Sequence, residues 1–162
     1  MLGRIASVGW VETQLSGCFT VCRVCNPTYA CSTVPPRSGK NTKLANGRHP
    51  KTQVPFDNRG FPNFERFVKF DTKIDSDRFR SAKSPEDQMK MATEDLNKAI
   101  ENGQISSSSF SAEQLAAIRS GKAKIPKYTW HHHQDTGRMQ LVREGTHRDT
   151  GHIGGTAMDK GK

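Results

Sequence analysis

Five of the six histidines in this 162-residue chain fall within a span of 22 residues, and any fold has to accommodate them together. They are His131, His132, His133, His147 and His152. A neutral imidazole is a common metal ligand, and several imidazoles can hold one divalent cation while another lies beside it. A surface run of histidines without a role would not predict further histidines at such short range. The cluster therefore predicts a metal site.

The residues around these histidines predict a β-hairpin followed by a short helix. Residues 127–132 (KYTWHH) alternate in character and include β-favouring Tyr, Thr and Trp, and residues 139–142 (MQLV) form a second strand-like run. Between them, residues 135–137 (DTG) indicate a turn. Residues 144–149 suit a short helix, which Gly151 ends. Such a unit would bring the histidines of the first strand opposite the two later ones.

Two amphipathic helices are predicted before the hairpin. The first covers residues 85–102, with Ser84 as a suitable N-cap, a proline at the first helical position and apolar residues at spacings of three and four. The second begins after Ser111, which can form a capping box with Gln114, and ends at Gly121. We expect both helices to pack together in a small core.

The part of the chain before these helices changes composition twice. Residues 32–53 are rich in Pro, Gly, Ser, Lys and Asn, which is typical of a linker. Residues 54–70 hold five of the eight phenylalanines. A segment this short cannot bury its own apolar surface, so we expect it to pack on later parts of the chain.

All four cysteines lie near the start, at Cys18, Cys22, Cys25 and Cys31. The first three have the spacing of a radical-SAM cluster loop, but the chain is too short for the large partial barrel of that chemistry. A small zinc site on the four thiolates fits better, although its last gap and the lack of strand signals weaken it. The alternatives are a structureless leader, two adventitious disulfides or the remnant of a longer protein.

The formal net charge of +9 is unevenly distributed. Residues 1–74 hold 11 Lys and Arg against 4 Asp and Glu, residues 75–120 hold 6 against 8, and residues 121–162 hold 8 against 4. A basic surface fits a polyanionic partner, and backbone phosphate is the usual one. Solubility or a basic arm would explain the same charge.

Composition restricts the classes of protein to which the chain can belong. Hydrophobic residues make up 33% of the chain, which supports a single modest core. No stretch approaches the roughly 18 apolar residues of a membrane span, so no span is expected. The first residues lack the continuous apolar block of a signal peptide.

The histidine segment resembles a known nuclease family. It is similar to the WHH family of the HNH, or His-Me finger, superfamily. The similar positions are Trp130-His131-His132, the QDxGxMQLV pattern of residues 134–142, His147 and the HxGG of residues 152–155. Members of that family are common as toxin domains in bacterial polymorphic toxin systems, and the resemblance extends over about residues 46–157.

The resemblance implies an α+β fold in which a helical region precedes a ββα-metal motif. The implied organisation is a cysteine-containing leader over residues 1–45, an aromatic linker and packing segment over residues 46–80, and the nuclease domain over residues 81–162.

The resemblance also implies roles for the histidines. His131, His147 and His152 would bind one divalent ion (Mg, Mn, Zn or Ni), and His132 would be the general base. His133 is then a neighbour without a required role. This assignment depends on the strand register, because a slip of one residue reverses the face on which each imidazole lies.

Two positions depart from the family pattern. The middle Asn of the HNH name has no counterpart other than Gln140, and Arg143 stands where relatives often have Pro. Neither departure removes a proposed ligand. Candidate contacts to the nucleic-acid backbone are Lys127, Arg138, Arg143 and Arg148, for which ordinary solvated charge is the alternative.

Together with the histidine cluster, the resemblance implies a metal-dependent endonuclease acting on DNA. Backbone contacts carry little sequence information, so we expect weak sequence preference. The resemblance implies an interbacterial toxin with an acidic immunity protein, located in the cytoplasm of its producer or delivered into that of a target cell. An RNase and a non-catalytic, zinc-stabilised nucleic-acid-binding module are the alternatives.

Overall fold

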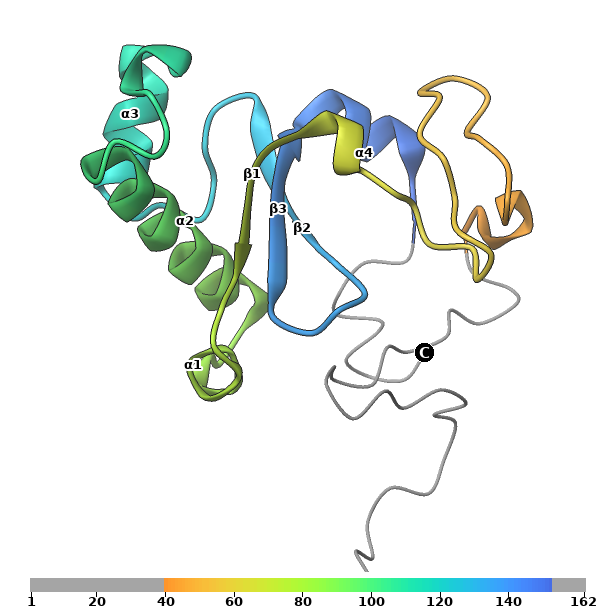
Figure 1. The fold of residues 1–162 in the computed structure, drawn as a ribbon, viewed down its shortest axis with the longest axis horizontal. Coiled ribbons are helices and arrows are strands. Elements are labelled where there is room, and N and C mark those ends of the chain that lie inside the picture. The colour runs from red at the N-terminus through yellow and green to blue at the C-terminus, as the bar shows by residue number, and fades with distance from the viewer. Residues whose placement is uncertain (1–39, 153–162) are drawn as a thin grey trace, which may run out of the picture.

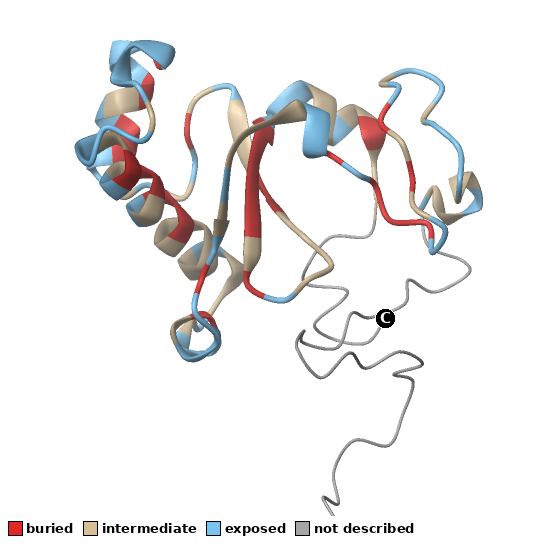
Figure 2. Cartoon of the chain, in the orientation of Figure 1, coloured by how far each residue is buried: buried red, intermediate tan, exposed pale blue. Residues whose placement is uncertain are grey.

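The computed structural model describes residues 40–152, which form an α+β fold around a small antiparallel sheet (Figure 1). Within these residues the sheet consists of β1 (Val68–Lys73), β2 (Tyr128–His132) and β3 (Arg138–Arg143), in the order β1-β3-β2. The central strand β3 pairs with both neighbours and is almost entirely buried (Figure 2). The predicted fold class is confirmed.

Two helices that the sequence patterns predict cover one face of the sheet. The first, α2 (Pro85–Glu101), begins at Ser84, whose hydroxyl accepts a hydrogen bond from a first-turn amide. The second, α3 (Ala112–Arg119), begins with the predicted capping box between Ser111 and Gln114. The buried core on this face consists of Ile74, Phe79, Ala92, Leu96, Phe110, Ile118, Ile125, Trp130, Met139 and Leu141.

The aromatic segment and the last helix, α4 (Glu144–Thr150), cover the other face (Figure 1). Val54 and Phe64 pack there against Val142 of β3, which confirms that this segment packs on later residues. Strand β1 is formed by the end of the aromatic segment and was not predicted. A helix that was also not predicted, α1 (Ser76–Ser81), comes directly after it.

Gly137 closes the hairpin between β2 and β3, as the DTG turn predicts. Its φ of 83° lies in the left-handed region, and a Cβ there would come within 2.8 Å of the Ile74 carbonyl oxygen. The same turn accepts a hydrogen bond from the Ile74 amide at 2.9 Å. Glycine therefore permits both the turn and the close approach of the chain that leaves β1.

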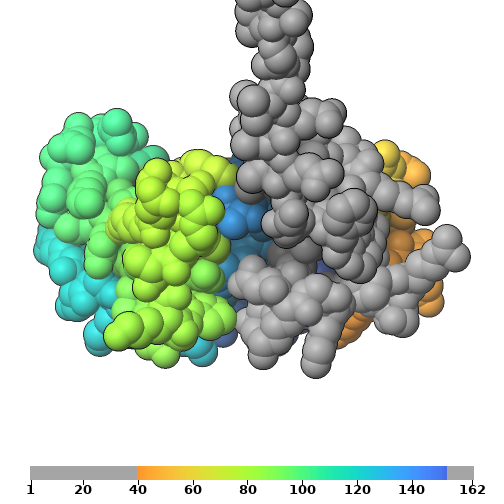
Figure 3. All heavy atoms as spheres, turned by 90° about the horizontal axis from the view of Figure 1, so that it is seen from below, coloured from red at the N-terminus to blue at the C-terminus, as the bar shows by residue number. Residues whose placement is uncertain are grey.

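Residues 40–53, part of the predicted linker, pack against α4. The hydroxyls of Thr52 and Thr150 are 2.8 Å apart, and Lys51 forms an ion pair with Asp149 at 2.8 Å. These residues and α3 lie at opposite ends of the molecule (Figures 1 and 3).

The four cysteines of the leader lie outside the described residues, so the predicted alternatives for them stay open. In the described part of the chain, no helix combines the length and the apolar character needed to cross a membrane.

Candidate metal centre

His131 of β2 faces away from the helical core. Its neighbour Trp130 points toward α2, where the indole Nε1 donates to Thr93 Oγ1 at 2.9 Å. Successive side chains of a strand point to opposite faces, so His131 enters the side covered by α4 and the aromatic segment. It is 2% exposed, and β2 thus places an imidazole inside the protein.

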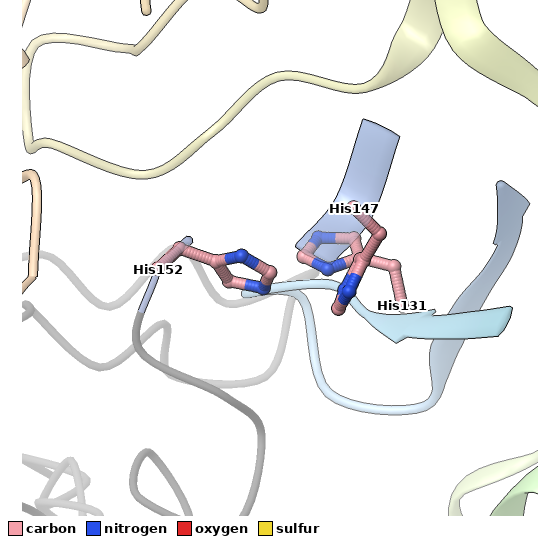
Figure 4. Close-up of side chains that lie close together, drawn as sticks. All are labelled: His131, His147 and His152. Atoms are coloured by element: carbon pink, nitrogen blue, oxygen red, sulfur yellow. The ribbon is translucent and has the colours of Figure 1, made fainter. Parts of the chain in front are cut away.

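Two further imidazoles come from α4 and the turn that ends it. His147 lies in α4, and Gly151, with a φ of 52°, turns the chain so that His152 returns toward the sheet. Figure 4 shows the three rings gathered from these segments. One ligand atom from each residue lies within 4.8 Å of the others, and the ring centroids are 4.6 to 5.4 Å apart. The structure therefore brings His131, His147 and His152 together.

Phe64 packs against all three histidines. Its ring centroid lies 4.8 Å from that of His131, 5.5 Å from that of His147 and 5.7 Å from that of His152. This apolar wall contributes to the burial of the imidazoles. The sequence contains no signal that distinguishes Phe64 from the other phenylalanines of its segment, because the contacts span more than sixty positions.

Burial keeps these imidazoles neutral. Desolvation, followed by the charges of neighbouring histidines, holds the pKa of His131 well below its ordinary value. Desolvation is also the main reason that the pKa of His147 falls to about 4 and that of His152 to about 3. At neutral pH each ring therefore has a lone pair available for a metal.

The hydrogen bonding of the group fits a cation. Within the described residues, both ring nitrogens of His131 and the Nδ1 of His152 are buried without a hydrogen-bond partner. Leaving a buried polar atom unsatisfied costs free energy, and a metal ion would supply the missing partner. These histidines could hold one metal ion.

His132 lies outside this group. Its Nε2 is 3.0 Å from Oε1 of Gln88 on α2, on the face of β2 opposite His131. It is nevertheless close enough that a positive charge on it would lower the pKa of His147. Its role as the general base remains a prediction.

His133 is on the same face as His131, with ring centroids 6.3 Å apart. Its Nδ1 lies 3.3 Å from a carboxylate oxygen of Asp135, and its Nε2 lies 3.4 Å from Nη1 of Arg138. Burial lowers its pKa, and the carboxylate of Asp135 opposes that shift. The turn residues thus hold His133 beside the three-histidine group.

Arg138, a predicted backbone contact, pairs with the carboxylates of two exposed residues, Glu65 and Asp71. Its Nε donates to the two Asp71 oxygens at 3.1 and 3.0 Å, and its Nη2 lies 2.8 Å from Glu65 Oε1. Gln140, which pairs with His131 across the hairpin, donates to Asp71 at 2.9 Å. The carboxylates of Asp71 and Glu65 therefore offset the charge of Arg138. The contact of Arg138 with nucleic acid stays a prediction.

The other predicted backbone contacts lie on the surface. Lys127 and Arg143 are exposed, and the Arg143 guanidinium lies 5.9 Å from the Tyr128 ring centroid. Arg148 is also exposed and pairs with the adjacent Asp149 at 3.2 Å. The nucleic-acid contacts of all three stay predictions.

Asn41 holds the turn that carries His152. Its Nδ2 donates to the carbonyl oxygens of Thr150 at 2.6 Å and Gly151 at 2.9 Å. These carbonyls lie at the C-terminal end of α4, where no further helical turn supplies amide groups to bond them. A residue from the predicted linker thus positions the third histidine.

Replacing Asn41 with alanine is expected to lower the metal affinity of the full chain by about tenfold, because residues that orient a ligand contribute on that scale. Calorimetric titration with zinc or nickel measures it. Asn46→Ala is the matched control, since both asparagines have a left-handed backbone, with φ of 64° and 60°. Equal metal affinity in the two variants would rule out this positioning role.

Comparison with known proteins places this site in a family. A family model described as the DNase/tRNase domain of colicin-like bacteriocin matches residues 54–154, which is more than half of the chain. The match includes the sheet and His131, His147 and His152, while residues 40–53 precede it. A comparison with curated proteins found no match. The chain belongs to the family of DNase/tRNase domains of colicin-like bacteriocins, and it is a nuclease toxin domain.

Proposed function

We propose that this chain is a metal-dependent endonuclease of the HNH type, in its WHH subgroup, that hydrolyses phosphodiester bonds of DNA. The observation that carries the proposal is the convergence of three neutral imidazoles from a strand, a helix and the turn after it. The hairpin followed by α4 supports the ββα arrangement that the resemblance implies.

In this proposal His131, His147 and His152 hold one divalent ion. Imidazole ligands favour zinc or nickel over magnesium or manganese among the candidate ions. When bound, the ion stabilises negative charge that develops on the phosphoryl and leaving oxygens. The protein supplies the fixed positions of the ligands, and the apolar ring of Phe64 packs against all three imidazoles.

His132 accepts the proton of the attacking water. A neutral imidazole has one ring nitrogen with a lone pair that can take a proton, and Nε2 of His132 lies 3.0 Å from Gln88 Oε1, which helps to hold the ring. The water oxygen bonds to phosphorus as the bond to the 3′ oxygen breaks, and the leaving oxygen takes a proton from solvent.

DNA is the proposed substrate, and RNA is the second candidate because the family description names both activities. The net charge of +9 supports a polyanionic substrate of either kind. Contacts to phosphates would give weak sequence preference.

The family supports a biological setting as well. We infer that the domain is an interbacterial toxin, delivered into the cytoplasm of a target cell, and that its producer makes an immunity protein. An acidic surface on that partner would complement the positive charge of this chain.

Plasmid cleavage by the full chain is expected to stop after chelation and to return with zinc, nickel, manganese or magnesium, because the imidazoles need an ion to stabilise charge. Parallel digestion of plasmid and total RNA with the same ions identifies the substrate. Cleavage of RNA alone would make the protein an RNase. Failure to cut either substrate with any ion would favour the non-catalytic zinc module.

A further inference from the structure

A hollow of about 310 Å³ lies at one end of the sheet, where β1 and β2 begin and β3 continues into α4. Its lining residues are Arg66, Phe67, Val68, Lys69, Tyr128, Arg143 and Thr146. Three of them are cationic and none is acidic. The hollow therefore concentrates positive charge from segments that are distant in the sequence.

The cations of this hollow are not neutralised by the protein. Within residues 40–152, no salt bridge joins Arg66, Lys69 or Arg143 to a carboxylate. Lys69 Nζ lies 5.3 Å from the Phe110 ring centroid, and the Arg143 guanidinium lies 5.9 Å from that of Tyr128. Such ring contacts orient cations without removing their charge, in contrast to the carboxylates that hold Arg138.

The hollow adjoins the three-histidine group through two elements. Thr146 of α4 directly precedes His147. Tyr128 and His131 both belong to β2, and the three-residue step between them spans about 10 Å along the strand. A separation of this size lies within the reach of one bound nucleic-acid strand, whose phosphates repeat every few ångströms.

We propose that this hollow binds a backbone phosphate of the nucleic-acid substrate, on a nucleotide near the bond that is cut. Arg66, Lys69 and Arg143 are its ligands, and guanidinium groups suit phosphate because they can donate two parallel hydrogen bonds. The proposal rests on the proposed function, since the phosphate belongs to the polymer held at the histidines. It adds Arg66 and Lys69 to the substrate contacts and distinguishes Arg143 from the neutralised Arg138.

The test is equilibrium binding of a short fluorescein-labelled DNA duplex to the full chain in EDTA, over a series of salt concentrations. Arg66→Gln, Lys69→Gln and Arg143→Gln are each expected to weaken binding and to reduce the slope of log affinity against log salt by about 0.9. Arg119→Gln is the control, because Arg119 is an exposed arginine at the far end of α3. Its slope is expected to equal that of the parent.

Charge-retaining variants separate phosphate binding from damage to the fold. Arg66→Lys and Arg143→Lys are expected to keep the salt slope of the parent, because they keep the positive charge. If loss of the arginine damaged the fold instead, the lysine variants would also bind the duplex more weakly. Unchanged slopes in all three glutamine variants, or an equal loss in Arg119→Gln, would overturn the proposal.

Plasmid cleavage by the parent protein, with metal, tests the proposed function on the same preparations. If the parent cuts while the glutamine variants keep its salt slope, the hollow is not a phosphate site and the nuclease proposal stands. If the parent neither binds the duplex nor cuts DNA or RNA, both proposals fail.

Discussion

Replacing His131 with alanine is expected to lower plasmid cleavage by about a thousandfold or more. A catalytic metal contributes several kcal/mol to the stability of the transition state, and each 1.4 kcal/mol corresponds to about tenfold in rate. The substitution removes the most buried of three imidazoles, which is 2% exposed. Metal affinity is expected to fall by about a hundredfold or more, since even residues behind the ligands contribute up to that factor. Cleavage assays and calorimetric titration measure both effects.

His133→Ala is the matched control for this experiment. His133 lies on the same face of the chain as His131, but Asp135 and Arg138 hold its ring. The His133→Ala protein is therefore expected to keep the metal affinity of the parent. Circular dichroism checks that both variants are folded, because either substitution removes a buried ring. Parent-like metal affinity in a folded His131→Ala protein would show that the ion binds elsewhere.

Replacing His132 with alanine is expected to reduce cleavage by about 10² to 10⁴, the usual contribution of a general base. Metal affinity and DNA binding are expected to stay close to those of the parent, because His132 is outside the three-histidine group and contacts Gln88 instead. Plasmid cleavage, metal titration and duplex binding on one preparation provide the three readouts. This separation of binding from cutting distinguishes a base from a ligand.

His133→Ala again provides the comparison. It removes the imidazole next to His132, which lies on the other face of the chain. The variant is expected to keep the plasmid cleavage of the parent. Cleavage at the parent rate by His132→Ala would reject the base assignment. Loss of cleavage in His133→Ala together with full activity in His132→Ala would transfer the role to His133.

Much of the secondary structure could be predicted because its signals are local. The caps at Ser84 and Ser111 act within one helical turn, and both helices begin where these residues place them. The glycines at positions 137 and 151 adopt positive φ within the predicted turn and at the predicted helix end. Such interactions involve residues a few positions apart, so a sequence pattern contains them in full.

The elements that could not be predicted depend on distant partners. Strand β1 begins within the aromatic segment, which lacks clear alternation, and its place in the sheet comes from pairing with β3, about seventy residues later. The contact of Phe64 with three histidines and the hold of Asn41 on the end of α4 are equally long-range. Strand and packing preferences depend on such neighbours more than on the residue itself.

The sequence alone determined which residue types were available for chemistry: a dense group of imidazoles on a hairpin and a short helix, with the family resemblance that they carry. The tertiary structure decided which imidazoles meet and which cations remain available. Sheet geometry directs His131 inward and His132 toward α2, and the carboxylates of Glu65 and Asp71 hold Arg138 while Arg143 keeps its charge. The reason is that burial and charge compensation depend on atoms within a few ångströms in space, whatever their separation along the chain.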